Sequence, residues 1–155
     1  MTELSAGDNA PDFELPRDGG GKLSLASLRG QKVVLYFYPK DDTSGCTAES
    51  IDFSLLKPDF EKAGAIVLGM SPDSVKSHDK FKTKHKLAVE LVADEERKAL
   101  EAYGVWTEKS MYGRKYMGVE RSTFLIGADG RIARIWRKVK VPGHAAEVLE
   151  ATRAL

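Results

Sequence analysis

The chain contains one cysteine, Cys46, and its surroundings favour a reactive role. It follows the stretch YFYPKDDTSG, where an apolar run gives way to turn-forming residues, so we expect Cys46 in the first turn of a helix. Unpaired backbone N–H groups and the helix dipole stabilise a thiolate there, and the thiolate is the nucleophilic form of cysteine. The alternative is that Cys46 acts only as a small buried apolar residue, as free cysteines commonly do.

Two neighbours favour the reactive interpretation. If Thr43 is the helix N-cap, Cys46 is the third helical residue, and the capping hydroxyl is expected in the neighbourhood of the thiol. Pro39 has no N–H and fixes the chain just after the apolar run, so it can wall a pocket without competing for a ligand. Alone, each is commonly a cap or a strand stop. Together they predict a rigid pocket around an activated thiolate.

Length and composition place the chain among soluble globular proteins. Its 155 residues fit one domain, 1–155, with 42% hydrophobic and 30% charged residues. The net charge of +1 predicts no nucleic-acid partner and no anionic membrane surface. The N-terminal residues lack the pattern of a signal peptide. A single cysteine cannot form an internal disulfide, which indicates a reducing compartment and predicts a cytoplasmic protein.

The hydrophobic pattern predicts an α/β fold, with a mixed central sheet flanked by helices on both faces and an N-terminal β-hairpin. We expect Pro58 to end or kink the first long helix, and Ser71 or Asp73 to cap the second. The expected strands are 13–15, 22–24, 33–38, 65–71, 89–92, 122–126 and 131–137, and the expected helices are 46–63, a short helix within 71–86, 94–104 and 144–155.

The spacing Pro39-x-x-x-Thr43-x-x-Cys46 resembles the active-site motif of peroxiredoxins. The run FYPKDDTSGCTAE is similar to the subfamily called peroxiredoxin Q or bacterioferritin comigratory protein, and the likeness continues through GDNAPDFEL, SPDSVKSHDKF, RSTFLI, GADGRI and WRKVKVPGH. This resemblance implies a thioredoxin-like fold, no cofactor, a monomer and an antioxidant role. It also implies reduction of hydrogen peroxide and organic hydroperoxides, with Cys46 becoming a sulfenic acid.

The same resemblance assigns the remaining site residues. The Thr43 hydroxyl and the Cys46 backbone N–H are expected to hold the peroxide, and Arg121 to support thiolate and peroxide together. Glu49, one turn along the Cys46 helix, matches a Glu or Gln of the family and is a candidate for substrate binding. Without the resemblance, Arg121 is a solvated charge at a strand start and Glu49 merely favours a helix N-terminus.

The sequence departs from the subfamily at the resolving cysteine. Many members carry it five residues after the reactive cysteine, where this chain has Ile51, and others carry it around 74–86, which holds none here. We therefore expect a one-cysteine cycle with an external thiol reductant, thioredoxin or glutaredoxin with glutathione. The alternatives are a non-enzymatic peroxide sensor acting through a mixed disulfide at Cys46, and a thiol–disulfide oxidoreductase, which normally needs C-x-x-C.

Three other motifs predict no separate chemistry. GGGKLS lacks the spacing of a phosphate-binding loop and is interpreted as a turn. The three histidines are scattered, so no metal site is expected. The basic and aromatic segment 109–118 can mark nucleic-acid contact, but a mobile loop beside the active site is favoured, because no other basic face accompanies it.

Overall fold

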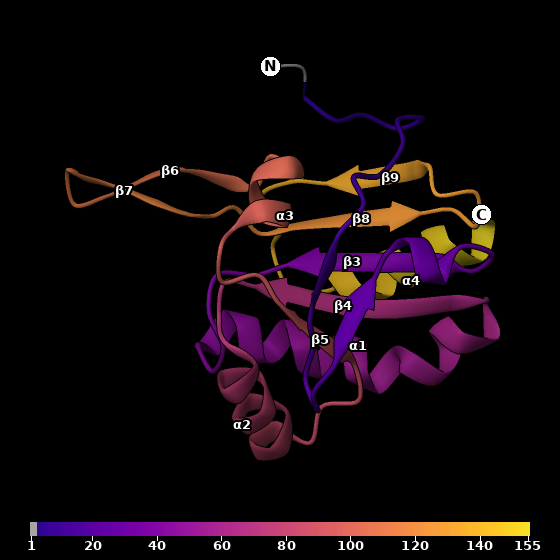
Figure 1. Cartoon of the computed structure of the whole chain (residues 1–155), viewed down its shortest axis with the longest axis horizontal. Coiled ribbons are helices and arrows are strands. Elements are labelled where there is room, and N and C mark those ends of the chain that lie inside the picture. The colour runs from indigo at the N-terminus through magenta and orange to yellow at the C-terminus, as the bar shows by residue number, and fades with distance from the viewer. Residues whose placement is uncertain (1–2) are drawn as a thin grey trace.

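The computed structural model describes residues 3–155 and has a five-stranded mixed sheet at its centre (Figure 1). The strand order is β5-β4-β3-β8-β9; β3 pairs parallel with β4 and antiparallel with β8. The sheet strands are β3 (Lys32–Phe37), β4 (Ala65–Ser71), β5 (Glu90–Ala93), β8 (Ser122–Ile126) and β9 (Ile132–Trp136). Two separate hairpins are β1 (Glu14–Pro16) with β2 (Lys22–Ser24), and β6 (Trp106–Met111) with β7 (Arg114–Val119).

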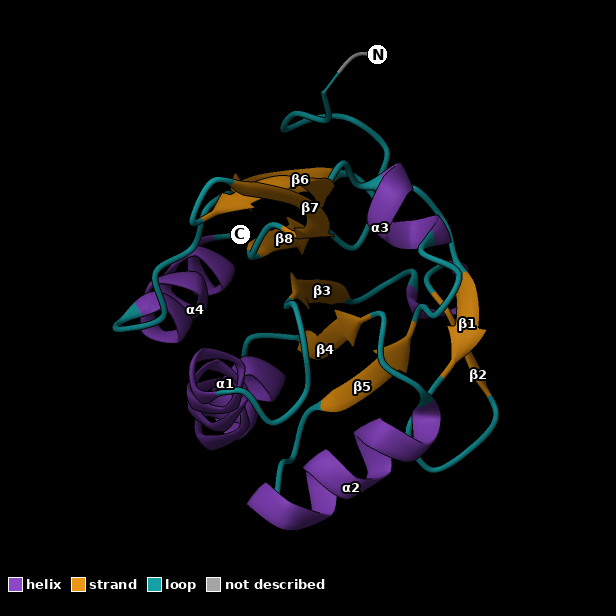
Figure 2. Cartoon of the chain, turned by 90° about the vertical axis from the view of Figure 1, so that its left-hand side faces the viewer, coloured by secondary structure: helices purple, strands orange, loops and turns teal. Residues whose placement is uncertain are grey.

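Helices cover both faces of the sheet, as the sequence predicted (Figure 2). The helices α1, α2 and α4 lie on one face, and α3 with the β1–β2 hairpin lies on the other. Their bounds are Ser44–Lys62 for α1, Val75–His85 for α2, Lys98–Ala102 for α3 and His144–Ala154 for α4, with a short 3-10 helix over Ala26–Leu28. Among the described residues, none of the helices combines the length and apolar character that a membrane span needs.

Strand β3 supplies side chains to both faces because successive residues of a strand point in opposite directions. Val33, Leu35 and Phe37 pack into the core beneath α3, whereas Val34 and Tyr36 pack into the core beneath α1 and α4. All five are buried. A continuous apolar run is what a strand covered on both faces requires, and the predicted central strand is confirmed.

Helix α1 is fixed to the sheet at the middle of β3. The Tyr36 ring stacks on Phe53 with centroids 4.6 Å apart, and its hydroxyl lies 2.8 Å from the hydroxyl of Ser50. Gly69 of β4 leaves room for this ring, since a Cβ at that position would lie 2.7 Å from the Tyr36 hydroxyl oxygen. The glycine therefore sets how closely α1, and the cysteine it carries, approaches the sheet.

Two predicted helix boundaries were wrong. Ser74, rather than Ser71 or Asp73, caps α2, because its hydroxyl accepts a bond from the Ser77 N–H. Helix α3 begins at Lys98, not at residue 94, because residues 94–97 form a turn in which Arg97 has a left-handed φ of 63°. Helix α1, predicted over 46–63, spans Ser44–Lys62, and the exposed Pro58 lies inside it without ending it.

Residues 109–118 do not form the loop that was predicted but most of the β6–β7 hairpin. Its turn has positive φ at both central residues, 52° at Tyr112 and 77° at Gly113, which is typical of a two-residue turn matched to the strand twist. Tyrosine is an unusual residue for that conformation, so the hairpin signal in the sequence was weak.

We predict that Gly69→Ala destabilises the fold by about 1–3 kcal/mol, because the added methyl meets a buried ring that Ser50 and Phe53 already hold in place. Urea unfolding measures the change. The double variant Gly69→Ala/Tyr36→Phe removes one of the two clashing atoms, the hydroxyl oxygen, while the ring carbon Cζ stays, and should lose less stability than the two single losses added together. Strict additivity would contradict the proposed contact.

Candidate active site

The connection from β3 to α1 places Cys46 in the first turn of α1. Thr43 is the N-cap with extended backbone angles, φ −91° and ψ 155°, so Cys46 is the third helical residue, as predicted. The expected capping bond is absent: the Thr43 hydroxyl donates instead to the Lys40 carbonyl at 2.8 Å. Pro39 lies half-buried just after β3. The first turn of α1 keeps N–H groups that no helical carbonyl accepts.

Arg121 connects the thiol to Glu49. Its Nη2 donates to the Cys46 Sγ at 3.2 Å, and its Nη1 donates to the Glu49 Oε1 at 2.6 Å. Cys46 and Glu49 are each 1% exposed, and the Arg121 side chain is 17% exposed. The structure thus brings together three predicted residues and aims a cation at the sulfur from a distant part of the chain.

Gly45 is a residue of this site that the sequence analysis missed. A Cβ at Gly45 would lie 3.3 Å from the Arg121 Nη2, so the absence of a side chain lets the guanidinium approach the helix. Glycine inside a helix is destabilising by roughly 0.5–1 kcal/mol relative to alanine. A glycine directly before the reactive cysteine was therefore the available signal.

Burial changes the ionisation of the acidic partner. Burial raises the pKa of Glu49 to about 7, and the charge and hydrogen bond of Arg121 oppose this only in part. The Glu49 Oε2 is buried without a partner, which adds to the penalty for the ionised form. The Glu49 carboxyl therefore changes from its neutral to its ionised form near neutral pH, and the net charge beside Cys46 changes with it.

A buried ion pair ties the loop before α1 to helix α2. The Asp41 carboxylate accepts from the Tyr38 hydroxyl at 2.6 Å, the Ser77 hydroxyl at 2.8 Å and the His78 Nδ1 at 2.8 Å. The His78 Nε2 lies 3.0 Å from the carbonyl of Val92. Both ring nitrogens face acceptors, so the imidazolium form satisfies both. Sequence reasoning missed this pair, because Asp41 and His78 lie on different elements.

The histidines lie in separate settings. His78 pairs with Asp41, His85 pairs with Asp42 at 2.7 Å, and the His144 Nε2 lies 2.8 Å from the Thr123 hydroxyl. Within residues 3–155, no group of three or more potential metal ligands was found.

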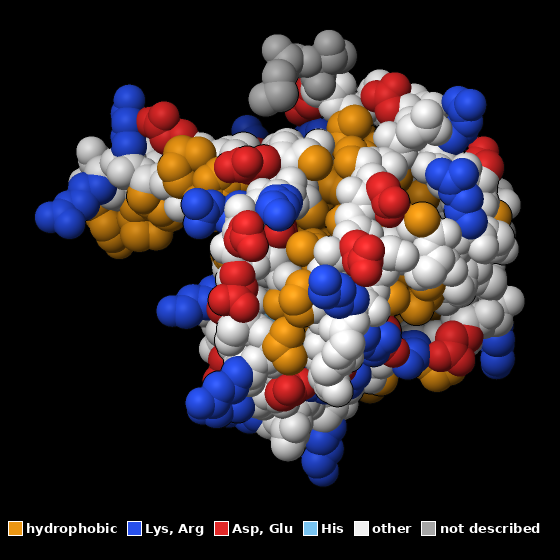
Figure 3. All heavy atoms as spheres, viewed as in Figure 1, with side chains coloured by type: hydrophobic (Ala, Val, Ile, Leu, Met, Phe, Trp, Pro, Cys, Tyr) orange, Lys and Arg blue, Asp and Glu red, His pale blue; other side chains and the backbone are white. Residues whose placement is uncertain are grey.

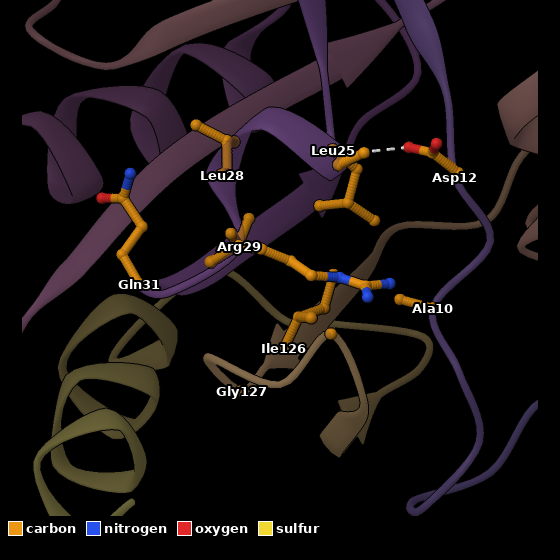
Figure 4. Close-up of a pocket in the computed structure, with 11 residues that line it drawn as sticks. Ala10, Asp12, Leu25, Leu28, Arg29, Gln31, Ile126 and Gly127 are labelled. Carbon is orange, nitrogen blue, oxygen red and sulfur yellow. Dashed lines mark hydrogen bonds between the residues drawn. The ribbon is translucent and has the colours of Figure 1, made fainter.

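A small, partly open cavity lies at the opposite end of the sheet from Cys46. It is lined by Gln31 and Val33 at the start of β3, whereas Cys46 follows the other end of that strand. Figure 4 shows the Arg29 side chain lying across it between Leu25 and Ile126. Its volume of about 30 Å³ suits a water molecule rather than a substrate.

The chain matches known proteins over almost its whole length. The AhpC/TSA family profile matches residues 6–135. The peroxiredoxin Bcp of Bacillus subtilis is 47% identical over 150 residues, which cover 97% of this chain and 96% of the relative. The chain belongs to the peroxiredoxin family. The established family activity, thiol peroxidase chemistry, is therefore this enzyme's activity.

Solved peroxiredoxins share the fold. A cysteine-to-serine variant of Xylella fastidiosa PrxQ superposes with a TM-score of 0.94 at 44% identity, covering 99% of this chain and 98% of that one. The predicted thioredoxin-like fold is confirmed.

Two Xanthomonas campestris Peroxiredoxin Q structures, each with a TM-score of 0.88, are 49% and 48% identical and cover 92% of this chain and 90% of theirs. They carry serine at two different cysteines, whereas this peroxiredoxin has only Cys46. A third structure, 48% identical with the same TM-score and coverage, concerns the alkyl peroxide reduction activity of the Xanthomonas campestris bacterioferritin comigratory protein.

We predict that Glu49→Gln removes a pH-dependent step from peroxide reduction. As pH rises through about 7, ionised Glu49 offsets the Arg121 charge, so the oxidation rate per thiolate should fall by about threefold to tenfold in the wild type. The variant should show no such fall. Stopped-flow oxidation rates, divided by the thiolate fraction from ultraviolet absorbance, measure the effect. A fall retained in the variant would assign the titration to another group.

We predict that His78→Gln destabilises the protein by about 3–5 kcal/mol below about pH 6.5, because it leaves the Asp41 charge buried without its partner. Burial lowers the pKa of His78, but the hydrogen bond and charge of Asp41 outweigh it, so the pKa is raised overall. The stabilisation from the imidazolium is therefore complete below the unfolded value and is lost as pH rises through the folded one.

Urea unfolding across this pH range measures the His78→Gln effect. The matched control is His85→Gln, whose partner Asp42 is exposed, and it should change stability far less than His78→Gln does. If the loss of stability caused by His78→Gln grew with pH, His78 and Asp41 would not form a charged pair.

Proposed function

We propose that Cys46 is the peroxidatic residue of a one-cysteine peroxidase cycle, with Arg121, Thr43 and Pro39 forming its site. The observation that carries the proposal is the 3.2 Å hydrogen bond from the Arg121 Nη2 to the Sγ of the chain's single cysteine, in the first turn of α1. A cation and a helix N-terminus both favour negative charge on that sulfur.

In the first half of the cycle, the Cys46 thiolate attacks the terminal oxygen of a hydroperoxide. The S–O bond forms as the O–O bond breaks, which yields a Cys46 sulfenic acid and an alkoxide or hydroxide that takes a proton to leave as alcohol or water. The Arg121 guanidinium, already directed at the sulfur, is placed to stabilise charge as it moves onto the leaving oxygen.

Thr43, Pro39 and Glu49 have supporting roles in this proposal. The Thr43 hydroxyl donates its hydrogen bond to the Lys40 carbonyl. The lone pairs of the hydroxyl oxygen can therefore accept a hydrogen bond from a peroxide O–H. Pro39 walls the loop and presents no competing N–H. Glu49 orients Arg121 through the 2.6 Å bond rather than contacting the peroxide itself.

In the second half, an external thiol reduces Cys46. The chain has no second cysteine to condense with the sulfenic acid, so the first reductant thiol forms a mixed disulfide and releases water. A second thiol then releases Cys46. We propose thioredoxin, or glutaredoxin with glutathione, as the source, with hydrogen peroxide and organic hydroperoxides as substrates, which the alkyl peroxide activity of the Xanthomonas campestris relative supports. We further propose a single-domain, cytoplasmic monomer that serves antioxidant defence.

We predict that Cys46→Ser lowers peroxide consumption by at least about 1,000-fold without unfolding the protein, because serine is nearly isosteric but a far weaker nucleophile. Consumption is followed with a thiol reductant in excess, and circular dichroism checks the fold. In the wild type without reductant, whole-chain mass spectrometry should show gains of one, two and three oxygens.

Two outcomes would overturn this cycle. A dominant covalent dimer, reversed by dithiothreitol, would place the resolving thiol on a second copy. A wild type that is oxidised once per chain, with no turnover in the presence of dithiothreitol, would indicate a sensor rather than an enzyme.

A further inference from the structure

The β6–β7 hairpin, residues 106–119, projects as an arm beyond the sheet (Figures 1 and 3). In Figure 3, hydrophobic side chains lie along the arm and lysine and arginine side chains lie toward its end. Four large apolar side chains here are strongly exposed, with exposed fractions of 56% for Met111, 99% for Tyr112, 44% for Tyr116 and 51% for Met117. Large apolar side chains exposed together on one projecting element commonly mark an interaction surface.

The strand register divides the arm into two faces. Paired residues of an antiparallel ribbon share a face, so Lys109 with Tyr116 and Met111 with Arg114 lie together. A Cβ at Gly118 would touch both Lys109 and Tyr116, which confirms the grouping. We call this the inner face; its members are Thr107, Lys109, Met111, Arg114, Tyr116 and Gly118. The outer face holds Glu108 and Lys115, which form an ion pair at 3.6 Å, together with the exposed Met117.

The inner face turns toward the side of the sheet that carries Cys46. At the root of the arm, the outer-face residues Trp106 and Val119 pack into the core beneath α3. The inner face therefore points the opposite way, toward the side of α1. Arg121 follows the arm by two residues and reaches the thiol.

Lys109 gives an independent sign of this proximity. Burial and the Arg121 charge lower the pKa of Lys109, against the opposing charges of Cys46 and Glu120. The Lys109 ammonium thus lies within electrostatic range of the reactive pair. The inner face borders the approach to Cys46.

The chemistry of the inner face is cationic and apolar. It carries Lys109 and Arg114 beside exposed Met111 and Tyr116, and its members include no carboxylate. Methionine and tyrosine provide adaptable contact area, and arginine binds carboxylates in bidentate fashion. A ligand that covers this face must therefore present acidic and apolar groups together, across a span that a small thiol does not have.

We propose that the inner face of the arm docks the protein that reduces Cys46, and that this partner carries acidic and apolar side chains around its dithiol. The inference rests on the proposed one-cysteine cycle. One partner thiol attacks the Cys46 sulfenic acid, forming the mixed disulfide and releasing water. The second partner thiol attacks the partner sulfur of that bond, so Cys46 leaves as the thiolate and the partner, oxidised by two electrons, keeps an internal disulfide.

Two synthetic dithiol peptides test the partner chemistry on the full-length protein. Both contain Cys-x-x-Cys and a tryptophan; one is flanked by glutamates and the other by lysines. Peroxide first oxidises Cys46, and single-turnover rates of its reduction are then measured. Each peptide rate is divided by the dithiothreitol rate of the same protein, which removes changes in the reactivity of Cys46 itself.

The acidic peptide should react at least about tenfold faster than the basic peptide with the wild type at low salt, and the ratio should shrink at high salt. Arg114→Glu should reduce the ratio to near one. The matched control is Lys115→Glu, the same charge change at the next residue but on the outer face, and it should keep the wild-type ratio. Tyr116→Ser should slow both peptides, because it removes apolar contact.

The result that overturns the inference is a wild-type ratio near one, or an equal response of Arg114→Glu and Lys115→Glu. Either leaves the proposed cycle intact as long as dithiothreitol restores the thiol. If dithiothreitol fails to restore it, the one-cysteine cycle is wrong and the docking inference falls with it.

Discussion

The hydrogen bond from Arg121 to Cys46 depends on the antiparallel pairing of two neighbouring strands. In the register of β3 with β8, Phe37 lies opposite Ser122, so the chain leaves β3 where it enters β8. Cys46 follows the first of these ends and Arg121 precedes the second. A one-residue slip between the strands would turn every side chain of β8 to the other face and remove the guanidinium from the sulfur.

The two cores protect that register. Leu35 of β3 packs beneath α3 and Val34 packs beneath α1 and α4, so a slip would exchange side chains of different shape between two close-packed cores. The site itself contributes little to this order. It contains a partly buried charge on Arg121, a buried carboxyl on Glu49 and a glycine in the first helical turn, all of which are unfavourable for the fold alone. The position of Cys46 thus rests on stability supplied by the packing of the sheet and its helices.

The sequence predicted most of the fold, because buried strands and amphipathic helices follow from residue patterns that are local. The central strand, the parallel strand at 65–71 and the C-terminal helix are confirmed. The errors lie where one local signal competes with another. Residues 94–97 include good helix formers, but Arg97 adopts a left-handed conformation, so α3 begins only at Lys98. The Tyr112-Gly113 turn has tyrosine where asparagine, aspartate or glycine is usual, so the hairpin was not recognised.

The candidate site was predictable only in part. The motif around Cys46 and the resemblance together named Arg121 and Glu49, but no pattern within one segment shows that both bind each other beside the thiol. Asp41 and His78 are 37 residues apart, so their pairing is a property of tertiary structure alone. Gly45 carried a local signal, an unfavourable glycine at a helix start, whose reason became visible only with the guanidinium in place.

The Asp41–His78 pair also determines which parts of the molecule unfold together. Asp41 belongs to the loop that ends in the reactive helix turn, and its carboxylate accepts hydrogen bonds from two residues of α2, Ser77 and His78. Fraying of α2 would leave the buried Asp41 carboxylate without its hydrogen-bond donors. The helix and the loop are therefore expected to open together, as one cooperative unit within the native state. The loop beside the thiol then opens as often as α2 does, although α2 lies outside the pocket. Amide hydrogen exchange along α2 would measure how often both open.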